Sequence, residues 1–300
     1  MDMTQNKCCR HGANLRRRRR RRRKILRSII FSCSIIAVAV FVAVGSSMIR
    51  SGDGRTNKYD VEAGNNTYDN AVIENSKISE KNKIQNNQSM LDDIMNSTQY
   101  PKQLKDLALK NEEALEFVYD YPAEHVKEHT IDLTEEASMD SVPLFVQWDK
   151  RWGYEKYSGN FFAASGCGPT TLSMVVVYLT HNREASPIAV AKYSKEAGYS
   201  VDGSGSSWTL ISEGCRHYGV KAKTVALDES RMKAELDAGH PIVINVGPGD
   251  FTDTGHFMVI TGYDDEGFSI NDPNSIEKSG KRWLFRNISS QIRAVCSMYV

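Results

Sequence analysis

The sequence predicts a mixed α+β domain in its C-terminal half, preceded by a single membrane-spanning helix and a flexible stem. Three observations predict this arrangement. Helix-like segments come first and short runs rich in Val, Ile and Phe come after them, which is typical of α+β folds rather than of alternating βαβ units. An uncharged stretch, 28–49, is long enough to cross a bilayer. A long polar segment lies between that stretch and the domain.

The first 27 residues are strongly basic. They contain twelve Lys or Arg side chains, including an unbroken run of eight from Arg16 to Arg23, and one acid, so their net charge is +11. The rest of the chain carries a net charge of −10. A basic flank beside an apolar stretch is typical of a cytoplasmic tail, although nucleic acids and anionic lipids also attract such runs. We therefore expect residues 1–27 in the cytoplasm and no nucleic-acid partner.

The apolar segment Ser28–Ile49 predicts a membrane helix. A cleaved signal peptide has a shorter apolar region and an Ala-x-Ala-like cleavage site, of which the sequence VAVGSSM is a weak version. Cleavage therefore stays open as an alternative to a retained anchor. With the positive charges inside, the chain after residue 49 is expected outside the cell. The sequence thus predicts a single-pass membrane protein with an extracellular domain.

Residues 50–140 are interpreted as the stem. From Ser51 to Asn96 the chain is rich in Asn, Ser, Lys and Glu, with few apolar residues, so we expect disorder there. A more regular piece near 102–119 predicts one helix, because apolar side chains recur at helical spacing: Leu104, Leu107, Ala108, Leu115 and Val118. The folded domain is expected to occupy 141–300.

The stretch ASGCGPTTLSMVVVYL, 164–179, predicts a helix that begins just after Cys167. Pro169 fits the first turn of a helix, where its missing N–H costs nothing. A cysteine at a helix N-terminus lies near unpaired N–H groups and the positive end of the helix dipole, which favour a thiolate. The flanking glycines allow another segment to approach closely. A small buried cysteine at a tight helix start has the same pattern, so this stretch alone leaves both interpretations open.

Further helices and strands are expected after this helix. The helices lie near Pro187–Ala197, Trp208–Tyr218 and Glu229–Ala238, and the strands correspond to the sequences PIVINV, HFMVITGY and GFSINDP. The last two strands predict a hairpin with a three-residue loop, 265–267, in which Gly267 has a positive φ. In that register Asp264 lies opposite Phe268, and even-numbered residues of both strands share one face.

His256 and Asp272 are both even-numbered and are therefore expected on the same side of the hairpin. Taken singly, His256 is typical of a half-buried histidine after a turn, and Asp272 of an ordinary turn residue. Taken together with Cys167, they supply a nucleophile, a base and a group that orients the base. The three residues predict the chemistry of an activated thiol.

Three motifs of this sequence resemble the papain-like cysteine peptidases related to the bacteriocin-processing, double-glycine-leader enzymes, in their stand-alone bacterial form: GCGPTTLSMVVVYL, GHFMVITGYDDEGFSINDP and VPLFVQWDKRWG. The resemblance covers about residues 141–300. It implies a papain-like fold, with N-terminal helices packed on a C-terminal antiparallel sheet. It also implies that Cys167 is the nucleophile, that His256 is the general base and acid, and that Asp272 holds the imidazole.

The resemblance further implies a glutamine that donates to the oxyanion, and Gln147 is the candidate. It lies 20 residues before Cys167, farther than in papain-like motifs, so a hydrogen-bonding role at the end of a strand is the alternative. Exporter-linked relatives carry several membrane helices and an ATPase. This sequence shows one apolar span and no G-x-x-x-x-G-K-[ST] motif, so it does not support leader-peptide export.

The expected function is hydrolysis of peptide bonds in a peptide or protein substrate, through a thioester acyl-enzyme. Two alternatives remain open. One is a catalytically silent surface module that binds peptides or cell wall, and the other is a thiol amidase or acyltransferase. The sequence indicates no substrate-binding residues and no cleavage preference. No cofactor is expected, and no metal site, because no spacing of His, Cys, Asp and Glu indicates one.

The cysteines of the expected extracellular part are Cys167, Cys215 and Cys296. Their odd number leaves at least one of them unpaired. A bridge between Cys215 and Cys296 and a pair of buried free thiols are both compatible with the sequence.

Overall fold

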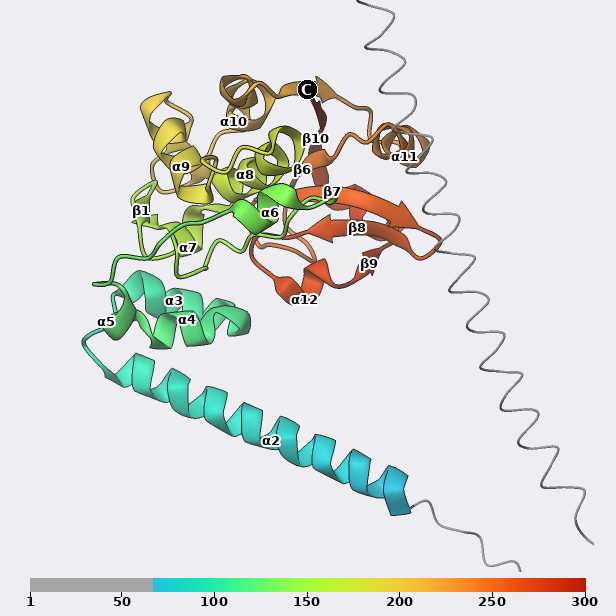
Figure 1. Cartoon of the computed structure of the whole chain (residues 1–300). Coiled ribbons are helices and arrows are strands. Elements are labelled where there is room, and N and C mark those ends of the chain that lie inside the picture. The colour runs from blue at the N-terminus through green and yellow to red at the C-terminus, as the bar shows by residue number, and fades with distance from the viewer. Residues whose placement is uncertain (1–66) are drawn as a thin grey trace, which may run out of the picture. The chain divides into compact units, whose positions relative to one another are not determined.

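The structure, a computed structural model, describes residues 67–300 (Figure 1). The expected cytoplasmic tail, 1–27, and the expected membrane span, Ser28–Ile49, lie outside the described residues. Within the described part, no helix combines the length and the apolar character that crossing a bilayer requires. The membrane anchor therefore stays a prediction.

Most of the helices precede the sheet in the chain, and the last four of them lie between its strands. The N-terminal ones are α2 (Thr67–Asn96), α3 (Lys102–Lys110), the 3-10 helix η1 (Glu112–Ala114), α4 (Leu115–Tyr119), α5 (Tyr121–Glu124) and α6 (Thr134–Ser138). The later ones are α7 (Phe162–Ser165), α8 (Cys167–Thr180), α9 (Pro187–Glu196), α10 (Thr209–Ser212), η2 (Gly214–Tyr218), α11 (Glu229–Asp237), α12 (Ile276–Ser279), α13 (Phe285–Ile288) and η3 (Ser289–Gln291). The helix expected near Trp208–Tyr218 is thus split in two at Glu213.

A six-stranded antiparallel sheet forms the centre, in the order β5-β10-β6-β7-β8-β9. Its strands are β5 (Lys221–Thr224), β6 (Ile242–Val246), β7 (His256–Asp264), β8 (Gly267–Asn271), β9 (Arg282–Trp283) and β10 (Ile292–Tyr299). Two small ribbons pair β1 (Lys156–Tyr157) with β2 (Asn160–Phe161), and β3 (Ser200–Val201) with β4 (Gly205–Ser206). The mixed helix-and-sheet class is as the sequence predicts.

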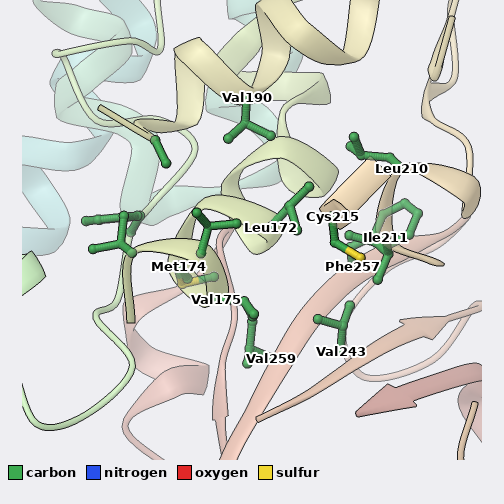
Figure 2. Close-up of a cluster of buried hydrophobic side chains, with 14 of the residues drawn as sticks. Leu172, Met174, Val175, Val190, Leu210, Ile211, Cys215, Val243, Phe257 and Val259 are labelled. Atoms are coloured by element: carbon green, nitrogen blue, oxygen red, sulfur yellow. The ribbon is translucent and has the colours of Figure 1, made fainter. Parts of the chain in front are cut away.

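Helix α8 packs on one face of this sheet. Residues 168–177 of the helix are all buried. Because side chains alternate across a strand, the odd-numbered apolar residues of β6 and β7 project toward the helix and join the cluster drawn in Figure 2: Val243, Phe257 and Val259. Even-numbered neighbours such as Met258 project to the opposite face, which α11 covers through Met232. The strand that carries His256 is therefore packed on both faces.

The turn of the β7–β8 hairpin differs from the expected one. Gly267 has a positive φ of 135°, as expected. However, Gly267 pairs with Asp264, so that Tyr263, and not Asp264, lies opposite Phe268. The unpaired loop contains two residues rather than three, and the register next to the turn is shifted by one position.

An irregularity in β7 compensates for this shift. The register changes again between Ile260 and Gly262, after which Ile260 lies opposite Ile270. On the side of the irregularity that is farther from the turn, even-numbered residues of the two strands therefore lie opposite each other. Because the strands are antiparallel, His256 at the start of β7 and Asp272 just after β8 lie at the same open end of the hairpin. The expected pairing of these two residues is thus reached by a different register.

Part of the segment expected to be disordered is helical. Helix α2 extends over Thr67–Asn96 and corrects that expectation for these residues. From residue 79 onward most of its side chains are exposed, whereas Ile94 near its C-terminal end is fully buried. A helix with so little apolar surface leaves almost no periodic pattern in the sequence, and therefore the composition suggested disorder.

Residues 97–138, here called the pre-domain segment, pack on the domain. The five apolar positions expected near helical spacing are all buried, and they share a cluster with Phe161 and Ala163 of the domain. The expected single helix is interrupted at Asn111, whose φ of −136° is extended. The ring of Phe117 stacks on Tyr154 of the domain at 4.2 Å between centroids. The second half of the expected stem is therefore part of the folded unit.

Replacing Leu104 with alanine should destabilise the whole domain. Leu104 is fully buried, and such a truncation costs about 2–5 kcal/mol. The melting temperature should then fall by roughly 4–20 °C. The matched control is Leu109→Ala on the same helix, because Leu109 is 57% exposed and should tolerate the change. Equal melting temperatures for the two variants would show that the pre-domain segment is an independent stem.

Candidate active site

Cys167 is the first residue of α8 and is partly exposed. Its two neighbouring glycines are needed for close packing rather than for unusual dihedral angles. A Cβ added at Gly166 would lie 2.6 Å from the ring of Phe162, and one added at Gly168 would lie 2.6 Å from Oγ of Ser206. The GCG motif therefore keeps a thiol at the helix start between two segments that approach the backbone.

A buried hydrogen bond connects the helix of Cys167 to the strand of His256. The hydroxyl of Thr171, one turn after Cys167, donates to the carbonyl of Phe257 at 3.0 Å. The ring of Phe257 stacks in parallel with Trp208, with 5.9 Å between centroids. Trp208 is half-buried and belongs to the main core rather than to a free loop. The second threonine of GPTT was the sequence signal for this connection, and sequence reasoning missed it.

The imidazole of His256 bonds to Asp272. Its Nε2 lies 2.6 Å from Oδ1 of Asp272, and the two residues are 6% and 1% exposed. Burial by itself lowers the pKa of His256, but the negative charge and hydrogen bond of Asp272 outweigh it, and contact with Cys167 adds to their effect. The pKa of His256 is therefore raised above its ordinary value. Because Nε2 is occupied by Asp272, Nδ1 is the ring nitrogen left for the thiol.

Asp272 is held in a tight turn. Its Oδ1 accepts a second hydrogen bond, from the backbone N–H of Asn274 at 2.8 Å. Its own N–H donates to the hydroxyl of Ser279 at 2.9 Å. No group among the described residues donates to Oδ2, which is buried. The direction of the carboxylate thus depends on His256 and on the shape of the turn.

Gln147 is buried beside both halves of the site. Its backbone N–H donates to the carbonyl of Pro273 at 2.7 Å, next to Asp272. Its side-chain Nε2 donates to the carbonyl of Ala163 at 2.7 Å, four residues before Cys167. An amide nitrogen carries two N–H groups, so one N–H remains for another acceptor. The structure thus places Gln147 against the segment that leads to Cys167, and its oxyanion role stays a prediction.

Tyr157 is a neighbour of Cys167 that sequence reasoning missed. Its buried hydroxyl shares hydrogen bonds with Ser206 at 2.6 Å and Ser194 at 2.8 Å. Burial raises the pKa of Tyr157, and the nearby Cys167 contributes to the same direction. An isolated tyrosine 10 residues before the cysteine carries no sequence signal that would have identified it.

The other described cysteines are free and buried. Cys215 and Cys296 form no disulfide, so the structure corresponds to the alternative of two buried thiols. Burial raises the pKa of Cys215 to about 11 and also raises the pKa of Cys296. Both thiols are therefore protonated and unreactive at neutral pH.

Two observations bear on ligands. Within residues 67–300, no group of three or more His, Cys, Asp or Glu side chains is placed to hold a metal ion. A groove of about 620 Å³ lies between α2, the pre-domain segment and α12, and its walls include neither Cys167 nor His256. The chemistry indicated by Cys167, His256 and Asp272 is therefore located apart from this groove.

A comparison with solved structures finds proteins similar to this chain. The chain is similar to the peptidase domain of Streptococcus ComA, a bi-functional ABC transporter involved in quorum sensing, with 19% identity over 45% of this chain and 90% of that chain and a TM-score of 0.37. It is also similar to a protein from Bacillus anthracis described as a C39-like peptidase, with 18% identity over 53% of this chain and 95% of that chain and a TM-score of 0.33.

A search among curated proteins finds no match. The model of the Peptidase C39-like family matches residues 139–293, which is slightly more than half of the chain. This matched region contains Gln147, Cys167, His256 and Asp272. On that match, the chain belongs to the Peptidase C39-like family.

Proposed function

We propose that this chain is a cysteine peptidase that hydrolyses peptide bonds through Cys167, His256 and Asp272. The observation that carries the proposal is the buried His256–Asp272 pair, 2.6 Å apart, next to a partly exposed Cys167 that contributes to the raised pKa of His256. A buried imidazolium beside a partly exposed thiol favours the thiolate, which is the nucleophilic form. A silent binding module would not need this arrangement.

The reaction follows from where charge develops. The thiolate of Cys167 attacks the carbonyl carbon of the scissile bond, and the resulting oxyanion accepts hydrogen bonds from the N–H of Cys167 and from the free N–H of the Gln147 amide. His256 gives its proton to the leaving amine as the C–N bond breaks. A water molecule then attacks the thioester carbonyl while His256 accepts a proton from this water. The C–S bond breaks, the carboxylic acid product leaves, and the Cys167 thiolate and the protonated His256 are regenerated.

We also propose that the enzyme is anchored in the cell membrane and acts outside the cell. The support for this part is the sequence alone: the uncharged segment Ser28–Ile49 follows a tail of net charge +11. A basic flank of this kind stays in the cytoplasm and leaves the following domain outside. Substrates would then be peptides or proteins of the cell surface or its surroundings.

Proteome-wide mapping of new chain ends in intact cells tests both parts. Cells with the wild-type protein should show cleavage sites that are missing with Cys167→Ala, and these sites should lie in extracellular proteins or segments. Cys215→Ala is the matched control, because its thiol is fully buried and protonated at neutral pH, and it should keep the wild-type pattern. Identical patterns for wild type and Cys167→Ala would contradict the peptidase function. Sites confined to cytoplasmic proteins would contradict the location.

A further inference from the structure

The turn that carries Asp272 is held from outside the family-matched region. Glu113, in the pre-domain segment, directs its carboxylate at the start of α12. Its Oε2 accepts hydrogen bonds from the backbone N–H groups of Ile276 at 2.7 Å and Glu277 at 3.1 Å. Its Oε1 accepts one from the hydroxyl of Ser275. One carboxylate therefore fixes three consecutive residues that follow the turn.

Asn111 holds the middle of the same turn. Its Nδ2 donates to the backbone carbonyl of Asn274 at 2.9 Å and to the side-chain oxygen of Asn274 at 3.1 Å. Its Oδ1 accepts from the N–H of Glu113 at 3.0 Å, which links the two residues. The indole of Trp148 donates to the same carbonyl of Asn274 at 3.3 Å. The break in the pre-domain helix at Asn111 is thus what turns this side chain toward the domain.

The residues that Asn111 and Glu113 contact lie two to five positions after Asp272. The N–H of Asn274 donates to Oδ1 of Asp272, and Ser275 forms a backbone bridge with Asp272. Pro273, between them, accepts a hydrogen bond from Gln147. Because Oδ2 of Asp272 has no donor among the described residues, Oδ1 alone connects the carboxylate to His256 and to the backbone of this turn. A shift of the turn would therefore change the position of the carboxylate relative to His256.

We propose that Asn111 and Glu113 are positioning residues of the active site. They act through the turn of residues 272–276 and hold the Asp272 carboxylate against His256. This inference rests on the proposed function for its catalytic meaning. It implies that the pre-domain segment is a working part of the enzyme, although it precedes the family-matched residues, 139–293.

The test uses full-length protein carrying Glu113→Gln or Asn111→Asp. Glutamine keeps the shape of Glu113 but can accept at only one of its two ends. Aspartate keeps the acceptor for the N–H of Glu113 but loses the donor to Asn274. Glu116→Gln is the matched control, because Glu116 is exposed on the next turn of the chain and has no contact with Asn274 or α12 among the described hydrogen bonds.

The first measurement is the midpoint pH at which His256 loses its proton, and it is made by NMR of protein labelled with ¹⁵N-histidine. Cys167→Ala is included as the background, so that Asp272 is the one remaining charge known to act on the ring. Asp272 raises the pKa of His256, so a loosened carboxylate should lower the midpoint. We expect a downward shift of about one pH unit in both variants, which corresponds to a tenfold weaker preference for the imidazolium, and no shift in Glu116→Gln.

The second measurement is turnover of peptide in the Cys167-containing protein, which should fall about tenfold with KM unchanged. An unmoved His256 midpoint in both variants would overturn the inference, even if the melting temperature falls, because the contacts would then be merely structural. The two proposals can fail separately. If the wild-type protein cleaves no peptide, the proposed function fails, whereas the NMR midpoint still decides whether Asn111 and Glu113 hold Asp272. Glu113→Asp keeps the charge and should restore part of the shift.

Discussion

Replacing His256 with alanine should lower peptide hydrolysis by roughly 10²–10⁴-fold, the usual contribution of a general acid and base. It should also slow alkylation of Cys167 by iodoacetamide at pH 6, by roughly 10- to 100-fold. The reason is that an imidazolium partner keeps a thiol ionised well below the pH at which an ordinary thiol ionises. A thiol without this partner has a more basic and more nucleophilic thiolate, but this gain offsets only part of the loss in thiolate concentration. Mass spectrometry of the Cys167 peptide measures the alkylation rate without interference from other cysteines.

The pH dependence of this reaction has a definite sign. The pKa of His256 is raised, so its ring stays protonated through neutral pH. The positive ring should therefore remain beside Cys167 between pH 6 and pH 8, and the wild-type alkylation rate should exceed that of His256→Ala throughout this range. Without the imidazolium, the rate should climb steadily over the same range, as it does for a thiol with no cationic partner. The difference between the variants should thus be largest at low pH and shrink as the pH rises.

Two further variants distinguish the loss of the imidazolium from a folding defect. Removing the ring leaves Asp272 as a buried charge without its main partner, which can destabilise the protein. His256→Gln keeps an N–H that can reach Asp272 but cannot hold a proton for the thiolate, and it should show the same loss of alkylation. His240→Ala is the histidine control, because His240 bonds to Glu235 on α11, away from the site. Wild-type alkylation in a folded His256→Gln protein would remove His256 from the mechanism.

The local chemistry of the site could be predicted from short sequence patterns. Pro169 marks the start of α8, and the two glycines around Cys167 indicate close approach, because these effects depend on neighbouring residues only. The register of the β7–β8 hairpin was harder to predict from the sequence. The even numbers of His256 and Asp272 placed them on the same side of the hairpin. The turn contains one residue fewer than expected, and the irregularity near Ile260 compensates for the resulting shift in register. Such irregularities depend on how the sheet packs, which a strand pattern does not show.

The parts that could not be predicted depend on contacts between distant segments. In the edge strand β5 only Ala222 is half-buried and the other three residues are exposed, so its apolar pattern is weak. The contacts of Asn111 and Glu113 with the turn after Asp272 span more than 160 residues, and nothing near either residue indicates them. A polar side chain in a segment that looks like a linker shows its role only when its partner is known. The expected stem was therefore interpreted from composition, and the structure corrects it.

Asp272→Asn should reduce turnover by roughly 10- to 100-fold while leaving the protein folded. An amide oxygen can still accept from His256 and from the N–H of Asn274, but it no longer offsets the positive charge of the ring. Hydrogen bonds that involve a charged group are worth about 1.5–3 kcal/mol, and each 1.36 kcal/mol corresponds to a tenfold change in rate. The loss should therefore be smaller than that of His256→Ala, and the midpoint for proton loss from His256 should move down.

Thermal unfolding measured beside single-turnover acylation of Cys167 separates this role from an ordinary turn. An asparagine suits turns as well as an aspartate does, so a residue that merely shapes the turn before Pro273 should leave both stability and rate near wild type. A stably folded Asp272→Asn protein with an unchanged acylation rate would exclude Asp272 from the site. The enzyme would then operate with Cys167 and His256 alone, and the contacts of Asn111 and Glu113 would have no catalytic group to position.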